Sequence, residues 1–257
     1  MTNNQISHKQ IIINDLLINY YSVLPEKKTS VKTLLFLHGW EVDSKLWFKI
    51  IPKLIEKNYS LYFLDLPGFG QSQIPDTTYG LDDYKKIVYE FIEKLGLKNI
   101  NLIGHSFGGS IAIKIASENP SFLTKLVLVN AAGIRQSSLL KNIKIKLAKI
   151  ISPLFFPSFM QVVRIKIYEL LGSEYLNNPP MSKIFSKIVS ENLTSFLSMI
   201  NKPTLIIMGD KDKVTPPLHG QEMNKKIKGS KLIILPTGHF SFIDQPEKFV
   251  RTLTAFI

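Results

Sequence analysis

A serine flanked by two glycines, Gly104-x-Ser106-x-Gly108, constrains the fold of this chain more than any other feature. A short apolar run at 100–103 precedes it, and a helical pattern follows at once, to about Asn119. A strand can turn into a helix this sharply only if the serine takes a strained backbone conformation. The residues two before and two after must be small, and glycine occupies both positions. The pattern predicts a nucleophile elbow, with the Ser106 hydroxyl exposed beyond the strand.

Apolar runs alternate with helical patterns along most of the chain. After a hairpin at 11–23, we expect strands at 33–37, 60–64, 100–103, 126–129, 204–208 and 231–235, and helices at 46–57, 81–95, 106–119, 218–228 and 246–256. Pro52 falls inside the first of these helices and is expected to kink it. Repeated strand–helix–strand units imply an α/β fold: a mainly parallel sheet with helices on both faces.

The alternation stops near Gly133 and resumes at Lys202, and only helical patterns lie between them. We therefore predict a core formed by residues 1–133 and 201–257, interrupted by a helical insertion at 134–200. Ligands of such sheets bind beyond the carboxyl ends of the strands, which is where Ser106 is expected.

A serine hydroxyl becomes a good nucleophile only when a base takes its proton, and that base needs a third group to orient it. His239 is the candidate base, because it follows a predicted strand and so lies at the carboxyl edge of the sheet. The other histidines are less suitable. His8 is close to the N-terminus, His219 falls in or near an ordinary helix, and His105 is held beside the serine and faces elsewhere.

The orienting acid should also follow a strand, between the serine and the histidine in sequence. Asp210 and Asp212 both meet this condition. We prefer Asp212 as the acid and assign Asp210 to stabilising the turn. The order Ser106, Asp212, His239 is the one associated with this type of elbow.

Acyl transfer also requires donors for the developing oxyanion. One donor is expected from the backbone N–H of Phe107, the residue after the nucleophile. The other is expected from the loop after the strand at 33–37, with the backbone N–H of Trp40 as the candidate. His38 in the same loop is expected to be structural rather than catalytic.

Composition excludes several other classes of site and protein. The chain has no cysteine, and no metal cluster or phosphate-cradling loop is evident, so we expect no metal and no cofactor. No apolar run approaches the roughly 20 residues of a membrane-spanning helix, and the polar residues 1–10 do not resemble a signal peptide. We therefore expect a cytoplasmic protein. The net charge of +12 comes mostly from lysine, and three arginines are too few to predict nucleic-acid binding.

Five motifs in order resemble those of the α/β-hydrolase superfamily, over nearly the whole chain. They are His38-Gly39-Trp40, Asp65-Leu66-Pro67-Gly68-Phe69-Gly70-Gln71-Ser72, Gly104-His105-Ser106-Phe107-Gly108-Gly109, Gly209-Asp210-Lys211-Asp212, and Gly238-His239 with Gln245-Pro246-Glu247. The resemblance implies an α/β-hydrolase fold with a lid of helices over the site, which fits residues 134–200. It also implies a serine hydrolase, because the dehalogenase and epoxide-hydrolase branches place aspartate where Ser106 stands.

Glu41 departs from the family pattern, since many relatives carry glycine after the oxyanion residue. A carboxylate pointing inward there would repel anionic substrates, whereas one facing solvent would not. We expect Glu41 to face solvent.

The insertion is strongly basic, with nine Lys and Arg against three Asp and Glu. Its lysines lie outside an apolar arc at 139–154, so they are either simply solvated or form a docking face for an acidic partner, such as an acyl carrier protein or an anionic membrane. Several large apolar residues in the insertion would suit an acyl pocket or ordinary packing: Phe155, Phe156, Phe159, Met160 and Met181.

Together these features predict hydrolysis of a carboxylic ester or thioester through an acyl-enzyme on Ser106, with His239 as base and Asp212 holding it. The substrate would be a small molecule or an acyl group bound to a carrier. Two alternatives use the same residues. One is carbon–carbon bond hydrolysis or a lyase reaction, and the other is ligand binding without turnover.

Overall fold

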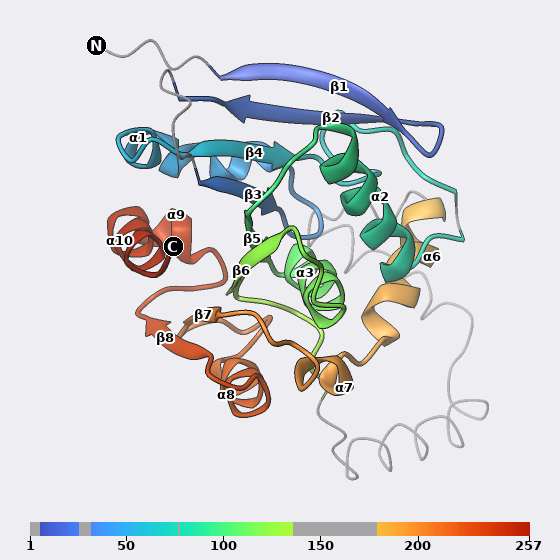
Figure 1. The fold of residues 1–257 in the computed structure, drawn as a ribbon. Coiled ribbons are helices and arrows are strands. Elements are labelled where there is room, and N and C mark those ends of the chain that lie inside the picture. Colours follow the sequence, from blue (N-terminus) through green and yellow to red (C-terminus); the bar gives the residue numbers. More distant parts are fainter. Residues whose placement is uncertain (1–5, 26–31, 77, 136–178) are drawn as a thin grey trace, which may run out of the picture.

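The computed structural model describes residues 6–25, 32–76, 78–135 and 179–257. Within these residues, eight strands form one sheet in the order β1-β2-β4-β3-β5-β6-β7-β8 (Figure 1). The strands are β1 (Ser7–Ile13), β2 (Leu16–Val23), β3 (Thr33–Leu37), β4 (Ser60–Leu64), β5 (Ile100–His105), β6 (Leu123–Val129), β7 (Thr204–Gly209) and β8 (Lys231–Leu235). Only β2 runs antiparallel to its neighbours, β1 and β4. The predicted, mainly parallel α/β fold is confirmed.

Helices cover both faces of the sheet (Figure 1). On one face lie η1 (Ser44–Ile50), α1 (Ile51–Ile55), α9 (Ser241–Asp244) and α10 (Pro246–Phe256), and on the other α2 (Leu81–Lys94), α3 (Phe107–Ser117) and α8 (Pro217–Lys226). Each face has its own cluster of buried apolar side chains. Because β5 is covered on both sides, all six of its residues are buried, as the continuous apolar run predicts.

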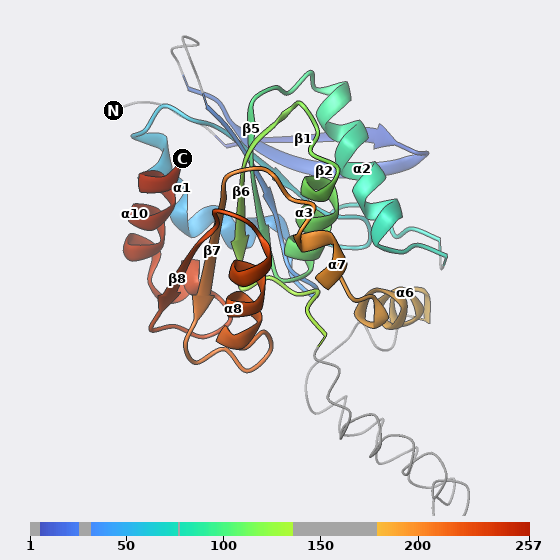
Figure 2. The ribbon, with the colours of Figure 1, turned by 60° about the horizontal axis from the view of Figure 1, so that its bottom comes forward.

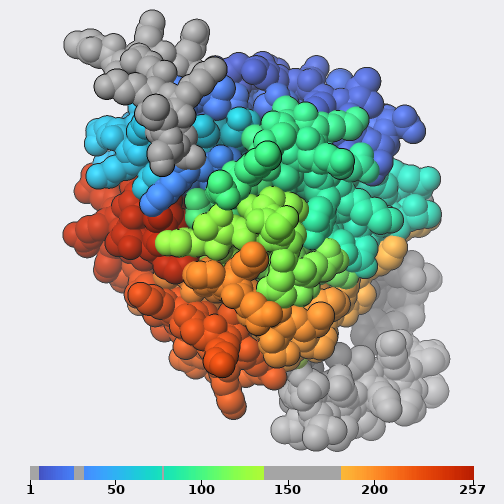
Figure 3. Space-filling model, in the orientation of Figure 1, coloured from blue at the N-terminus to red at the C-terminus, as the bar shows by residue number. Residues whose placement is uncertain are grey.

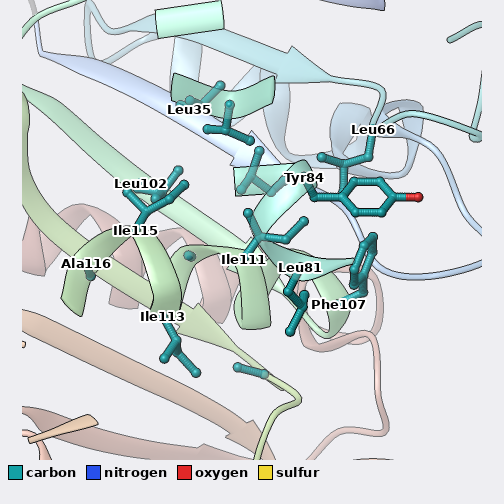
Figure 4. Packing of buried hydrophobic residues seen from close by; sticks show 14 of the residues in the cluster. Leu35, Leu66, Leu81, Tyr84, Leu102, Phe107, Ile111, Ile113, Ile115 and Ala116 are labelled. Carbon is teal, nitrogen blue, oxygen red and sulfur yellow. The ribbon is translucent and has the colours of Figure 1, made fainter. Parts of the chain in front are cut away.

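The packing between α3 and the sheet is dense. Figure 4 shows Ile111 and Ile115 of α3 directed toward Leu102 of β5, with Tyr84 and Leu81 of α2 beside Phe107. In the space-filling view, α2, α3 and α7 (Thr194–Leu197) form one continuous face of the molecule (Figure 3). This packing fixes α3, and with it the residue that precedes it, Ser106.

The prediction of one continuous helix at 46–57 is wrong in detail. The segment forms a 3₁₀ helix, η1, followed by the short α1, and Pro52 lies in the first turn of α1. A first-turn N–H has no intrahelical acceptor, so proline costs little there and begins the second helix instead of kinking one long helix. The Asp43 side chain caps η1 by accepting a hydrogen bond from the backbone N–H of Lys45 at 2.9 Å.

Part of the predicted insertion is described: Ile134 and Arg135 at its start, and α6 (Pro179–Ser190) and α7 near its end. Figure 2 shows α6 at the end of the molecule toward which the arrow of β6 points. The backbone N–H of Leu193 donates to the Gly133 carbonyl at 2.8 Å, so the beginning and end of the segment meet.

The other features expected in the insertion fall mostly outside the described residues. These are the apolar arc with its lysines and four of the five large apolar side chains. The fifth, Met181, is fully buried against the loop at Gly68, where a Cβ would lie 2.6 Å from its sulfur. Packing, and not a place in a substrate cavity, accounts for Met181. The division into core and lid remains a prediction.

Candidate active site

Ser106 occupies a sharp turn between β5 and α3, with backbone angles φ 49° and ψ −111°. The glycines on either side are required by close approach. A Cβ on Gly104 would lie 2.5 Å from the carbonyl oxygen of Gly108, and a Cβ on Gly108 would lie 2.5 Å from that of Leu37. The strained serine and its small neighbours confirm the elbow geometry expected from the sequence.

The strands around β5 decide where the turn lies. β5 pairs in parallel with β3 and β6, so that Gly104 is opposite Leu37 and His105 is opposite Val129. The loops after β3, β5 and β6 therefore emerge at the same edge of the sheet. A cavity of about 490 Å³ opens there, and Ser106 and His239 both line it.

Asp212 and His239 form a hydrogen-bonded pair beside this cavity. His239 Nδ1 lies 2.7 Å from Asp212 Oδ2, and the Asp212 side chain is fully buried. Among the described residues, no hydrogen bond joins the Ser106 hydroxyl to His239. Such contacts are often long without substrate and tighten when it binds. The structure thus brings the three predicted side chains to one place and joins two of them directly.

The Asp212 carboxylate accepts several hydrogen bonds besides that of His239. Oδ1 accepts from the backbone N–H groups of Val214 and Thr215 at 2.8 and 3.0 Å. Oδ2 accepts from Asn130 Nδ2 at 2.7 Å and lies 2.7 Å from the Thr215 hydroxyl. Burial by itself would raise the pKa of Asp212, but the hydrogen bonds from His239 and Thr215 outweigh it and hold the pKa well below its usual range. Asp212 is therefore ionised at neutral pH.

Asn130 is a member of this network that was not predicted from the sequence. It follows β6, is fully buried with φ 45°, and its Oδ1 accepts a hydrogen bond from the Ser241 hydroxyl at 2.7 Å. The Thr215 hydroxyl lies 2.9 Å from the Asn130 carbonyl oxygen. One signal in the sequence was available: Asn130 is a polar residue directly after a buried strand, like His239 and the aspartates.

The alternative acid, Asp210, is exposed. Its backbone N–H donates to the Leu235 carbonyl at 2.9 Å, and no hydrogen bond joins its side chain to His239 in the described residues. This position is consistent with the role in the turn that the sequence suggested.

The two expected oxyanion donors come from segments that meet at Ser106. Phe107 is the first residue of α3, so its N–H has no intrahelical acceptor. The loop carrying Trp40 approaches so closely that a Cβ on Gly39 would lie 3.3 Å from the Ser106 Cβ. The rings of Trp40 and Phe107 pack edge to face with centroids 5.3 Å apart, and both residues line the cavity. Their roles as donors remain a proposal.

His38 and His105 are both held by backbone contacts. His38 Nδ1 lies 2.7 Å from the Gly39 carbonyl, and Nε2 accepts from the Leu66 N–H at 2.9 Å, so His38 joins two loops as a neutral ring. Burial lowers its pKa. His105 Nε2 lies 2.9 Å from the His239 carbonyl oxygen. Burial, followed by the nearby His239, lowers the pKa of His105 to about 3. Both are structural, and His105 holds the backbone of the candidate base.

The motif beginning at Asp65 is also structural. The buried Asp65 carboxylate accepts from the backbone N–H groups of Ser44 and Gln71 at 2.9 and 3.0 Å, and from Asn19 Nδ2 at 2.7 Å. Gly70, at φ 56°, leaves no room for a Cβ, which would lie 2.2 Å from Asp65 Oδ2. The motif therefore ties the β4 loop to η1 and β2 and does not face the cavity.

Glu41 has φ 61°, in the left-handed region that glycine adopts at little cost. Glycine, which the family resemblance led us to expect here, would adopt this conformation without strain. Glu41 is exposed, as expected, yet it also lies on the rim of the cavity. Glu41 therefore faces solvent and at the same time lies at the edge of the space where a substrate would bind.

The cavity wall has an apolar side and several polar groups. Large apolar residues come from the β3 loop, α2, α3 and α6: Trp40, Leu81, Phe107, Phe185, Ile188 and Val189. Ser110, Arg135, Glu191 and His219 add polar groups that were not assigned to the site from the sequence. A more open groove of about 710 Å³ lies elsewhere, around Leu97 and Phe122, and contains none of the candidate site residues.

Two kinds of feature are absent from the part of the chain that the structure describes. Its His, Asp and Glu side chains form no group of three that could hold a metal ion. In the same residues, no helix has the length and apolar character needed to cross a membrane.

Comparisons of the sequence with known proteins point to a single family. A family model described as alpha/beta hydrolase fold matches residues 32–183 and 174–246. The AB hydrolase superfamily protein YisY of Bacillus subtilis is 28% identical over 244 residues, covering 88% of this chain and 91% of that protein. Monoacylglycerol lipase abhd6-A of Xenopus laevis is 28% identical over 265 residues, covering 91% and 76%.

Solved structures agree on the fold. The crystal structure of a membrane phospholipase A, described as a bacterial virulence factor, superimposes with a TM-score of 0.76 at 25% identity. The match covers 98% of this chain and 85% of that one.

Proposed function

This chain belongs to the α/β hydrolase fold family, and from that premise we propose that it is a serine hydrolase that cleaves a carboxylic ester or thioester through an acyl-enzyme on Ser106. The observation that carries the proposal is the 2.7 Å contact between the buried Asp212 and His239, which lines the same cavity as the strained Ser106. A nucleophile, a base and an acid that orients the base are the groups that acyl transfer requires.

In the proposed reaction, His239 Nε2 takes the Ser106 proton as the oxygen attacks the substrate carbonyl. The Nδ1–H of His239 donates to the ionised Asp212, which fixes the ring and stabilises the imidazolium that forms. The backbone N–H groups of Phe107 and Trp40 donate to the oxyanion. His239 then protonates the leaving alcohol or thiol as its bond to the carbonyl carbon breaks. In the second half of the reaction, His239 takes a proton from the attacking water and returns it to Ser106 as the bond to the serine oxygen breaks and the carboxylic acid leaves.

The apolar side of the cavity supports a substrate with an apolar acyl part, because the partly exposed residues Trp40, Phe185 and Val189 would be desolvated by it. A relative described as a monoacylglycerol lipase supports ester hydrolysis over the carbon–carbon alternative. Docking of an acidic carrier on the basic insertion stays a prediction from the sequence, since most of the lysines concerned lie outside the described residues.

The proposal is tested by Ser106→Ala, assayed on p-nitrophenyl acetate and butanoate and labelled with a fluorophosphonate. We expect kcat to fall by about 10⁴-fold or more and labelling to be lost, with unchanged circular dichroism. Ser121→Ala is the matched control, because Ser121 is exposed and distant from the cavity lining. Retained turnover in Ser106→Ala would refute the assignment. A panel that includes vinylogous diketones separates ester hydrolysis from carbon–carbon bond hydrolysis.

A further inference from the structure

Ser110 is a buried residue whose hydroxyl opens onto the cavity and has no partner among the described residues. Ser110 lies on α3 one helical turn after Ser106, is 3% exposed, and lines the cavity. Its backbone N–H donates to the Ser106 carbonyl at 3.2 Å, but its hydroxyl makes no hydrogen bond to any described residue. Serines within helices commonly bond back to the carbonyl four residues earlier, and Ser110 does not. An unpaired hydroxyl facing a cavity therefore points to a ligand group.

Glu191 brings a carboxylate to the same wall. Its Oε1 lies 2.6 Å from Lys114 Nζ, and Lys114 also bonds to Asp82 Oδ2 at 2.9 Å. Lys114 follows Ser110 by four residues, so the two side chains share one face of α3, and Glu191 lies over that face. No described residue donates a hydrogen bond to the second oxygen, Oε2, of Glu191.

The surroundings of these two groups are apolar. Leu81 and Phe107 lie together at the N-terminal end of α3 (Figure 4), and Ile188 and Val189 of α6 line the same cavity. An unsubstituted acyl chain would cover this wall and offer a hydrogen bond to neither the Ser110 hydroxyl nor Oε2 of Glu191. A hydroxyl on the chain would satisfy both, because it can accept from Ser110 and donate to Glu191.

We propose that Ser110 and Glu191 form a polar subsite that selects acyl groups carrying a hydroxyl a few atoms from the carbonyl. The inference rests on the proposed function of Ser106. One helical turn places the Cα of Ser110 about 6 Å along the axis from that of Ser106, which matches a hydroxyl at the third or fourth carbon of the acyl chain. Glu191 disfavours an acyl carboxylate. An ammonium is less suited than a hydroxyl, because Glu191 is already paired with Lys114 and the Ser110 hydroxyl needs a group that can accept.

The test compares kcat/KM for p-nitrophenyl 3-hydroxybutanoate and p-nitrophenyl butanoate. We expect the wild-type protein to prefer the hydroxy ester by about 10- to 100-fold, since a site built to bond a hydroxyl rejects the analogue without it. Ser110→Ala and Glu191→Ala should each bring this ratio close to one. Ser117→Ala is the matched control: Ser117 is a buried serine on the same helix, does not line the cavity, and bonds to the Lys114 carbonyl.

Each result of this test bears on a different part of the proposal. Equal turnover of both esters by the wild-type protein, or a ratio unchanged in Ser110→Ala, would overturn the subsite while leaving the proposed hydrolase intact. Preference for the 3-aminobutanoate ester over the hydroxy ester would overturn the choice of a hydroxyl. Failure to cleave any ester, together with no fluorophosphonate labelling, would refute the proposed function and the inference with it.

Discussion

On the β6–β8 side of the cavity, every oxygen of the buried Asp212 carboxylate has donors, and Asn130 in turn is held by Ser241. On the α3–α6 side, the Ser110 hydroxyl has no partner in the described residues and Glu191 uses one oxygen only. On the first side, which we call the closed side, the protein's own groups fill the hydrogen-bonding positions and hold one geometry. On the second, the open side, Ser110 and Glu191 keep hydrogen-bonding capacity for a ligand. This difference fits the roles proposed for the two sides, positioning of His239 on the first and recognition of the substrate on the second.

Replacing Asp212 with asparagine should have the largest effect, because it removes the charge on the closed side. We expect kcat to fall by about 10⁴-fold, because the amide N–H can donate to His239 Nδ1 and hold the wrong tautomer, and because the imidazolium loses its counter-charge. Kinetics on p-nitrophenyl butanoate measure this. A loss of less than tenfold would show that Asp212 does not orient the base.

The stability of Asp212→Asn should also depend less on pH than that of the wild-type protein. The pKa of Asp212 is lower in the folded protein than in the unfolded chain, so its ionised form stabilises the fold above the unfolded pKa of about 4. That contribution is lost as the pH falls below this value toward the folded pKa. Urea unfolding between pH 3 and pH 7 should show a smaller pH dependence in Asp212→Asn than in the wild-type protein.

Substitutions of Asn130 test whether the geometry of Asp212 and His239 on the closed side depends on this neighbouring residue. Asn130→Ala removes a donor to Asp212 and an acceptor for Ser241, and should lower kcat by about 10- to 100-fold with little change in KM. Asn130→Asp would put a second carboxylate where the amide now lies 2.7 Å from Asp212, and like charges so close raise the pKa of one of them. The acid limb of the kcat/KM profile should move to higher pH. A purely structural role would leave that limb unchanged.

Lys114→Met removes the cation that holds Glu191 on the open side. Lys114 is nearly buried, but its partners Asp82 and Glu191 are 59% and 32% exposed, so solvent screens much of the interaction. We expect a loss of about 1–2 kcal/mol in the free energy of unfolding and a reduced preference for the hydroxy ester, with the catalytic pair intact. Urea unfolding and the ester ratio measure the two effects. Lys53→Met, which breaks only the exposed pair with Glu247, is the control.

Glu41→Gly should have the smallest effect. Glycine relieves the left-handed backbone strain at φ 61° but adds freedom to the unfolded chain, so the net stabilisation should be about 0.5 kcal/mol. Thermal unfolding measures it, with Glu41→Ala as the variant that keeps the strain. A destabilised glycine variant would mean that the Glu41 side chain contributes more than its strain costs.

The sequence predicted those parts of the site that depend on local pattern. Ser106 was proposed from its glycines, and Asp212 and His239 from their positions after strands, and the sheet places all three at one edge, while their roles remain a prediction. Asn130 and Ser110 were not predicted, because an asparagine after a strand and a serine within a helix are ordinary locally. Their roles depend on what other segments bring near them. Pro52 was misjudged because the pattern did not reveal that a 3₁₀ helix precedes it.

The hydrogen bond between Leu193 and Gly133 has an evolutionary consequence. β6 and β7 pair directly in the sheet, and the bond joins the described beginning and end of the predicted insertion beside the cavity. We therefore expect that the length and lining of this insertion can change in evolution, while Ser106, Asp212 and His239 keep their places after the strands.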